Sequence, residues 1–170
     1  MDTFMRRFGT FVFVALMQIL FLNRISLFGY VTPLFYIWLI VRFDSYMKRT
    51  SMLLWAFSLG LVLDMFSGTP GLNAASATLL AMVQPGIVKM FVQTERYEQL
   101  FPSSATMGGR PFAGYLLLMT VLHHTTYFLL RSIPLGDWSV LVLKVIFSTL
   151  LTFIFMIVAE RLTSSSGTKR

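Results

Sequence analysis

The stretch Gly60-Leu-Val-Leu-Asp64-Met-Phe-Ser-Gly-Thr-Pro70-Gly-Leu-Asn73-Ala-Ala75 places one acidic residue inside an apolar run, just before a turn that contains glycine and proline. A carboxylate is costly in hydrocarbon, and an ionisable residue kept there usually has a function. Gly68, Pro70 and Gly71 are typical turn residues, and Asn73 follows them where a second helix begins. The stretch therefore predicts a helical hairpin with a polar corner.

The composition of the chain indicates that this hairpin lies in a membrane. Of the 170 residues, 56% are hydrophobic and only 12% are charged, which leaves too little polar surface for a soluble domain. The sequence contains no cysteine, so a disulfide framework and a thiolate metal site are both excluded. The class that remains is an integral membrane protein.

Six apolar stretches predict an all-α integral membrane protein, a six-transmembrane-helix bundle that forms a single domain over residues 1–170. A spanning helix needs about 20 mostly apolar residues, with about 17 as a practical minimum. The first three stretches are short, so we expect them to include flanking residues or to lie in a locally thinned bilayer. The predicted spans are 8–22, 27–41, 52–66, 72–92, 112–130 and 138–159.

The distribution of basic residues predicts that both termini are cytoplasmic. In this orientation eleven of the 14 lysines and arginines lie inside, Arg24 and Arg131 lie outside, and Lys144 falls within the last span. The net charge of +7 is then explained by basic residues scattered beside the membrane ends, where they also attract anionic lipid headgroups, and no nucleic-acid-binding motif is present. The eleven inside residues are Arg6, Arg7, Arg42, Lys48, Arg49, Lys89, Arg96, Arg110, Arg161, Lys169 and Arg170.

The sequence allows three interpretations of Asp64. It is an interfacial acid that accepts hydrogen bonds from water or the turn, a buried acid that joins two helices or meets a partner, or a proton relay. The relay is the weakest, because no second intramembrane acid is placed to receive the proton. Insertion scales give about 3 kcal/mol for a central Asp and less near an interface, so one or two hydrogen bonds offset the cost.

Asn73 is expected to cap the start of the second helix of the hairpin, since its side-chain oxygen can accept from free backbone N–H groups. A helix start that faces Asp64 also places backbone donors close to a carboxylate, which is electrostatically favourable. Lys144 either extends its ammonium group to the outer interface or pairs with Asp64 or with a partner's acid. These residues, with Gly68, Pro70 and Gly71, form the candidate assembly site.

His123 and His124 are adjacent, so they lie on different faces of the fifth predicted helix. A zinc pair on one helix needs a spacing of three or four residues and a third ligand, and neither is evident. Hydrogen bonds between helices are therefore expected instead, and Gln18 is interpreted in the same way. Because no catalytic motif or carboxylate cluster is found, we expect no enzymatic activity, no catalytic residues, no metal and no cofactor.

Three segments of the chain carry a family resemblance: the hairpin Gln18-Ile-Leu-Phe-Leu-Asn-Arg-Ile-Ser-Leu-Phe-Gly-Tyr-Val-Thr-Pro-Leu-Phe-Tyr36, the stretch from Gly60 to Thr78, and Met107-Gly108 followed by the span with the two histidines. With these segments the chain resembles the MreD family of bacterial rod shape-determining membrane proteins, in the form found in Bacteroidota. The acid followed by a Gly/Pro turn and an Asn-Ala helix start is the most specific of these features. The resemblance covers essentially the whole chain.

This resemblance implies a non-enzymatic, multi-pass scaffold of the bacterial inner membrane that helps control cell shape and peptidoglycan synthesis. Its expected direct partner is MreC, a protein with a single membrane span. Through MreC it would be linked to the MreB filament, the RodA glycosyltransferase and a class B penicillin-binding protein. The resemblance also implies a fold similar to the substrate-binding components of energy-coupling-factor vitamin transporters.

That likeness leaves a second function open, in which the outer region binds a small molecule and the first helix docks on an energising subunit. Docking of this kind uses small residues four apart near the start of the first helix. Here Gly9 and Ala15 are six apart, with Phe11 and Phe13 between them. This departure and the scarcity of polar groups favour the scaffold over the transporter component.

Overall fold

Seven α-helices and one short 3-10 helix form the described part of the chain, with no strand among those residues. The computed structural model describes residues 2–24, 31–92, 100–135, 138 and 140–166. Its elements are α1 (Asp2–Leu20), η1 (Leu22–Arg24), α2 (Ile37–Val41), α3 (Arg49–Ser67), α4 (Leu72–Phe91), α6 (Ser104–Met107), α7 (Gly109–Leu135) and α8 (Leu141–Ser166). The predicted all-α class is confirmed for this part of the chain.

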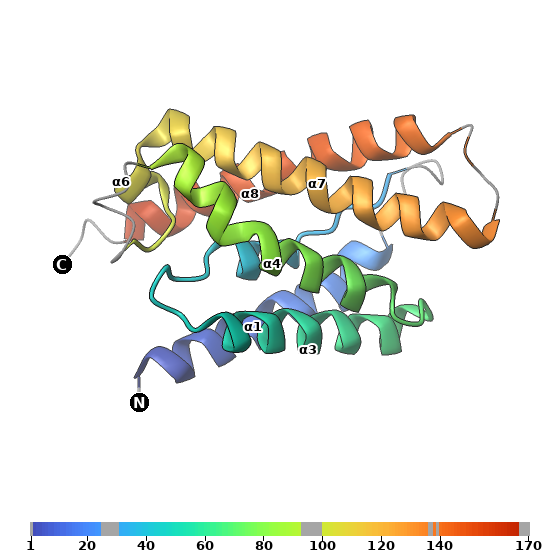
Figure 1. Ribbon diagram of the computed structural model, residues 1–170, viewed down its shortest axis with the longest axis horizontal. Coiled ribbons are helices and arrows are strands. Elements are labelled where there is room, and N and C mark those ends of the chain that lie inside the picture. The colour runs from blue at the N-terminus through green and yellow to red at the C-terminus, as the bar shows by residue number, and fades with distance from the viewer. Residues whose placement is uncertain (1, 25–30, 93–99, 136–137, 139, 167–170) are drawn as a thin grey trace.

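Four of these helices are long and apolar enough to cross a membrane. They are α3, α4, α7 and α8, which cover the predicted spans 52–66, 72–92, 112–130 and 138–159 apart from a few residues at their ends. In sequence order α3 packs on α4, α4 on α7 and α7 on α8, and the four helices run lengthwise through the molecule (Figure 1). Their length and composition indicate a membrane protein.

The six-helix count is not supported, and α1 is the first reason. This helix begins at Asp2 instead of residue 8, and its first two turns carry Arg6 and Arg7. The apolar part of α1 is therefore shorter than a full span, and α1 is not among the helices that meet the length and hydropathy required for crossing. It packs along α3 (Figure 1).

The second predicted span, 27–41, is the other reason, because its described residues, 31–41, contain no long helix. Residues 25–30 lie outside the described part, residues 32–34 have no regular structure, and α2 contains only five residues. Pro33 explains the difference, since it lacks an N–H donor and disfavours helical backbone at the residue before it. Residues 33–41 are nevertheless all buried, so this irregular segment lies in the core of the bundle.

Two hydroxyl groups of α8 satisfy the backbone of this irregular segment. The Thr32 N–H donates to Ser148 Oγ at 3.0 Å, and the Leu34 N–H donates to Thr152 Oγ1 at 3.1 Å. Irregular backbone at membrane depth is tolerated only where other protein groups supply hydrogen bonds. The polar residues of α8 therefore substitute for the helical hydrogen bonds that Pro33 prevents.

Gln18 of α1 completes this hydrogen bonding from the opposite side. Its Nε2 donates to the Pro33 carbonyl at 2.9 Å, and its Oε1 accepts from the Tyr36 N–H at 3.3 Å. One side-chain amide thus serves as donor and acceptor for the same stretch of backbone. The expectation that Gln18 makes a buried polar contact is confirmed, although it contacts the irregular segment instead of another helix.

Eight of the eleven described basic residues lie at one end of the bundle, which we call the arginine-rich end; Arg24, Arg131 and Lys144 lie elsewhere. It contains the starts of α1, α3 and α7 and the ends of α4 and α8, on the left in Figure 1. The α3–α4 turn lies at the opposite end, which we call the Asp64 end, and Arg131 lies near the end of α7 there. Arg96, Lys169 and Arg170 lie outside the described residues. The basic residues at the first end are Arg6, Arg7, Arg42, Lys48, Arg49, Lys89, Arg110 and Arg161.

Candidate functional site

The Asp64 carboxylate holds the end of α3 to the beginning of α4. Its Oδ1 accepts from Thr69 Oγ1 at 2.8 Å and from both the backbone N–H and the Nδ2 of Asn73 at 2.9 Å. Its Oδ2 accepts from the Ala74 N–H at 2.9 Å. Because the residue is only 5% exposed, these four donors replace the water that an interfacial acid would bind. We call Asp64, Thr69, Asn73 and Ala74 the Asp64 corner.

The prediction that Asn73 caps its own helix is wrong. Gly71 occupies the N-cap position, and it provides no side-chain hydrogen bond. Asn73 is the second residue of α4, and its Nδ2 donates to Asp64 and to Thr69 Oγ1, the latter at 3.0 Å. The cap comes from the preceding helix, since the Asp64 carboxylate binds the free N–H groups at the positive end of the α4 dipole. The expectation that the helix start faces Asp64 is confirmed.

The turn residues shape the corner through their backbone. Gly68 ends α3 with φ 63° and donates its N–H to the Asp64 carbonyl, and Gly71 precedes α4 with φ 75°. Both values lie in the left-handed region, where residues with a Cβ are disfavoured. Pro70 lies between them and is exposed. The sequence Gly-Thr-Pro-Gly therefore closes the turn tightly enough for Asp64 to reach α4.

Gly60 is a site residue to which the sequence analysis gave no role. It lies one helical turn before Asp64, and a Cβ placed on it would lie 2.4 Å from Ala74 Cα and 2.6 Å from the Asn73 carbonyl oxygen. Only glycine permits this approach of α3 to α4. A glycine four residues before a buried acid was the available signal, because both positions lie on one face of a helix.

A polar cavity of about 520 Å³ adjoins the Asp64 corner. The Asn23 Nδ2 donates to Ser67 Oγ at 2.8 Å across this region, and Arg131 donates to the Tyr127 hydroxyl at 3.3 Å. The cavity is therefore lined by amides, hydroxyls and one cation. Its lining residues are Gln18, Ile19, Leu20, Asn23, Thr32, Leu34, Leu63, Phe66, Ser67, Thr69, Asn73, Tyr127 and Arg131.

Lys144 is not part of this corner. It is a half-buried residue of α8, and none of the hydrogen bonds described for the Asp64 carboxylate involves it. Among the described residues Asp64 also makes no ion pair. The structure therefore brings together Asp64, Gly68, Pro70, Gly71 and Asn73 and leaves Lys144 apart from them.

The histidine pair joins α7 to two other parts of the bundle, which confirms the expected contacts between elements. His123 Nε2 lies 2.8 Å from the Tyr36 hydroxyl, in the irregular segment. His124 Nδ1 lies 2.9 Å from the Thr120 carbonyl, and its Nε2 lies 3.2 Å from Thr152 Oγ1 on α8. Since a carbonyl only accepts, His124 donates to the Thr120 carbonyl from Nδ1.

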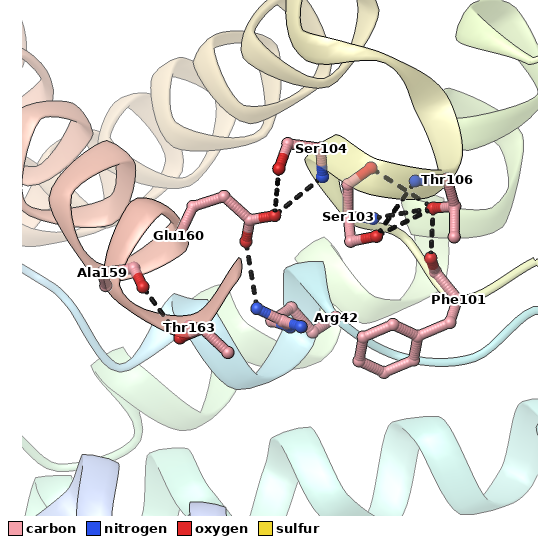
Figure 2. Close-up of polar contacts among 8 residues, drawn as sticks. All are labelled: Arg42, Phe101, Ser103, Ser104, Thr106, Ala159, Glu160 and Thr163. Carbon is pink, nitrogen blue, oxygen red and sulfur yellow. Dashed lines mark hydrogen bonds and ion pairs between the residues drawn. The ribbon is translucent and has the colours of Figure 1, made fainter. Parts of the chain in front are cut away.

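A second polar cluster lies at the arginine-rich end and is centred on Glu160 of α8 (Figure 2). One carboxylate oxygen accepts from the Arg42 guanidinium at 3.0 Å, and the other accepts from the backbone N–H and the hydroxyl of Ser104, both at 2.7 Å. Burial lowers the pKa of Arg42 from its usual value, while Glu160 opposes that shift. From the sequence, Glu160 and Arg161 are interpreted only as structural residues that close the last helix at the inner interface, and the contacts of Glu160 with Arg42 and Ser104 are not predicted.

Glu160→Gln is expected to lower the free energy of unfolding by about 1–3 kcal/mol, because it leaves the half-buried Arg42 without its counter-charge. Thermal unfolding of the purified protein in detergent measures the loss. Arg161→Gln is the matched control, since Arg161 is the exposed neighbour of Glu160 and is expected to unfold like the wild type. Equal stability of the two variants would show that the Glu160 cluster does not hold α8 to α2 and α6.

An apolar groove of about 450 Å³ runs along α3 and α4. Four of its lining residues are small, namely Gly71, Ala74, Ala75 and Thr78, and we call these four the groove floor; the others are larger and apolar. The groove begins at Gly71, directly beside the Asp64 corner, and ends near Met82. Its lining residues are Phe57, Gly71, Ala74, Ala75, Thr78, Leu79 and Met82.

Comparisons of the chain with protein-family models, curated proteins and solved structures found no match. The resemblance to the MreD family therefore stays a prediction. Within the described residues, no three His, Cys, Asp or Glu side chains lie close enough together to hold a metal ion. The site that the geometry defines is the Asp64 corner with the apolar groove on one side and the polar cavity on the other.

Proposed function

We propose that this protein is a non-enzymatic scaffold of the bacterial cell-elongation complex, where its bundle binds the single membrane span of MreC. The resemblance of the Gly60–Thr78 stretch and the first hairpin to the MreD family supplies the pathway. The described hydrogen bonds of the Asp64 carboxylate all go to residues of its own corner, which suits a structural role. The scaffold would act through shape, because the corner fixes the surface that α3 and α4 present.

The observation that carries the proposal is the apolar groove on α3 and α4. Gly71, Ala75 and Thr78 are spaced by four and three residues, so they share one face of α4. Small residues at this spacing let a second helix approach closely in lipid, where packing and not the hydrophobic effect drives association. Phe57 and Leu79 are exposed beside this floor and supply contact area. A single membrane helix is the partner that fits such a surface.

The proposed topology has six crossings with both termini in the cytoplasm of a bacterial inner membrane. Four crossings would be α3, α4, α7 and α8, and two would be α1 and the irregular segment that ends with α2. The clustering of the described basic residues at the arginine-rich end supports this orientation, because cytoplasmic ends carry an excess of lysine and arginine. Side chains of α1 and α8 form hydrogen bonds with the buried backbone of the irregular segment. These bonds support the crossings proposed for α1 and the irregular segment, since irregular backbone at membrane depth needs partners within the protein.

Co-purification from detergent tests the scaffold. The full chain is expected to recover MreC, and through it MreB, RodA and the class B penicillin-binding protein. Ala75→Leu fills the groove floor and is expected to reduce MreC recovery at least several-fold, as packing at a small-residue interface is lost. Val142→Leu is the matched control, because Val142 is exposed on α8 away from the groove.

Two results would contradict this reading. Recovery of MreC that is unchanged by Ala75→Leu would place the partner on another face. Failure of the correctly inserted wild-type protein to recover MreC would remove the proposed function. Asp64→Asn is also expected to weaken recovery without preventing insertion, because it loosens the corner at which the groove begins.

The polar cavity favours a second candidate function, a small-molecule-binding component of a vitamin-type transporter. In the sequence, the scarcity of polar groups counted against this function, but the fold brings several amide and hydroxyl groups together in this cavity. Arg131 also lines the cavity and suits an anionic ligand. Mass spectrometry of the protein purified from its native membrane decides between the two. A bound water-soluble molecule that is lost in Arg131→Gln would support the transporter component, and MreC without such a ligand supports the scaffold.

A further inference from the structure

The arginine-rich end contains a cavity of about 350 Å³ that neither candidate function uses. Its wall includes Arg6 and Arg7 of α1, Arg42 and Asp44 after α2, Phe101, and Thr163 of α8. Four separate segments of the chain therefore contribute to one pocket at the end of the bundle. The cavity lies beside the Glu160 cluster, because Arg42 lines the cavity and also pairs with Glu160, as Figure 2 shows for the pair.

The charges around this cavity do not balance. Arg7 forms an ion pair with Asp44, and Arg42 forms one with Glu160. Arg6 forms no ion pair among the described residues, and its guanidinium lies 5.5 Å from the centre of the Phe101 ring. Among the described residues, three cations thus face two carboxylates, which leaves one excess positive charge.

Arg6 and Arg42 are close enough to repel each other. The Arg42 guanidinium lies 4.8 Å from the centre of the same Phe101 ring, so a single aromatic ring contacts both cations. An aromatic face stabilises a cation only modestly, and it does not neutralise a pair of like charges. A phosphate between the two guanidinium groups would do so, because guanidinium matches the oxygen geometry of phosphate.

A stripe of exposed apolar residues leads away from this cavity along α1. Phe13 lines the cavity, and Leu16 and Leu20 follow it at spacings of three and four residues; all three are exposed. This spacing places them on one side of the helix. The stripe is therefore continuous with the basic cavity, which is the arrangement of an acyl chain attached to a phosphate headgroup.

We propose that the cavity of Arg6, Arg7 and Arg42 binds the phosphate of an anionic phospholipid, whose acyl chains lie along the apolar stripe of α1. Arg6, which forms no ion pair among the described residues, supplies the charge that the phosphate neutralises. Arg42 and Phe101 form the opposite wall, and Glu160 holds Arg42 in position. The site is independent of the proposed MreC partner, so it is tested on the purified protein alone.

Native mass spectrometry of the full chain in detergent, with an equal mixture of phosphatidylglycerol and phosphatidylcholine, measures the binding. The wild type is expected to retain phosphatidylglycerol preferentially. Arg6→Gln is expected to weaken that binding roughly tenfold, as one charge-assisted contact is lost. Arg110→Gln is the matched control, because Arg110 is an exposed arginine at the same end that does not line the cavity. Thermal unfolding confirms that Arg6→Gln, which changes an exposed side chain, remains folded.

Three outcomes would overturn the proposal. Equal binding of the two lipids would show that the headgroup charge is not recognised. Equal losses in Arg6→Gln and Arg110→Gln would indicate general attraction to basic residues instead of a site. Displacement of phosphatidylglycerol by inorganic phosphate at equal concentration would identify a site for a free anion, with no contribution from acyl chains on α1.

Discussion

Replacing Asp64 with alanine is expected to lower the free energy of unfolding by about 3 kcal/mol. The substitution leaves the N–H groups of Asn73 and Ala74 without an acceptor at the positive end of the α4 dipole. It also removes the acceptor of the Thr69 hydroxyl. Buried donors without partners are more costly in a membrane than in water, because lipid offers no hydrogen bonds. Chemical or thermal unfolding in detergent measures the change.

The loss in free energy of unfolding is expected to depend on which hydrogen-bonding groups the new side chain at position 64 retains. Asp64→Asn keeps an acceptor oxygen but adds donors that face the N–H groups of α4, so it is expected to lose about half as much stability as Asp64→Ala. Met65→Ala is the control, since Met65 is the next residue of α3 and is 76% exposed. If Asp64→Ala and Met65→Ala have the same free energy of unfolding, Asp64 is an interfacial acid whose hydrogen bonds water can replace.

Gly60→Ala is expected to destabilise the protein by about 2 kcal/mol, although alanine normally favours a helix. The added methyl group would lie 2.4 Å from a backbone atom of Ala74, so α3 and α4 must move apart. This movement lengthens the hydrogen bonds of the Asp64 corner. Unfolding in detergent measures the loss, and the substitution should also reduce MreC recovery, because the groove on α3 and α4 changes shape.

Gly86→Ala provides the matched control for this effect. Gly86 also lies within an apolar helix, α4, but a Cβ placed on it meets no atom within 4 Å. Alanine is therefore expected to leave stability unchanged or to raise it by up to about 1 kcal/mol. A loss of similar size in both variants would mean that helix backbone effects, and not the close approach at Gly60, decide the result.

The Asp64 corner was largely predictable, because the cost of an acid in lipid requires partners and the adjacent turn supplied them. Which side chain caps the start of α4 was not predictable. Asn73 had the right residue type for an N-cap, but whether its own oxygen or the carboxylate of the preceding helix binds the free N–H groups depends on how closely α3 approaches α4. That distance is set by Gly60, whose role is seen only when the two helices are packed together.

The stretch 27–41 shows where apolar composition gives the wrong secondary structure. Hydropathy reports burial, and residues 33–41 are indeed buried, but it does not report helix formation. Pro33 was the local signal against a continuous helix. The compensating partners, Gln18 on α1 and Ser148 and Thr152 on α8, are far away in sequence, so the irregular segment could not be inferred from its own residues.

Site-specific photo-cross-linking at Leu79 tests the central claim most directly. Leu79 lies in the apolar groove, and Leu143 on α8 is an exposed leucine outside it that serves as the control position. We predict that a cross-linker at Leu79 captures the membrane span of MreC in the native membrane and that one at Leu143 does not. Capture of MreC at Leu143 and not at Leu79, or at neither position, would contradict the proposed scaffold interface.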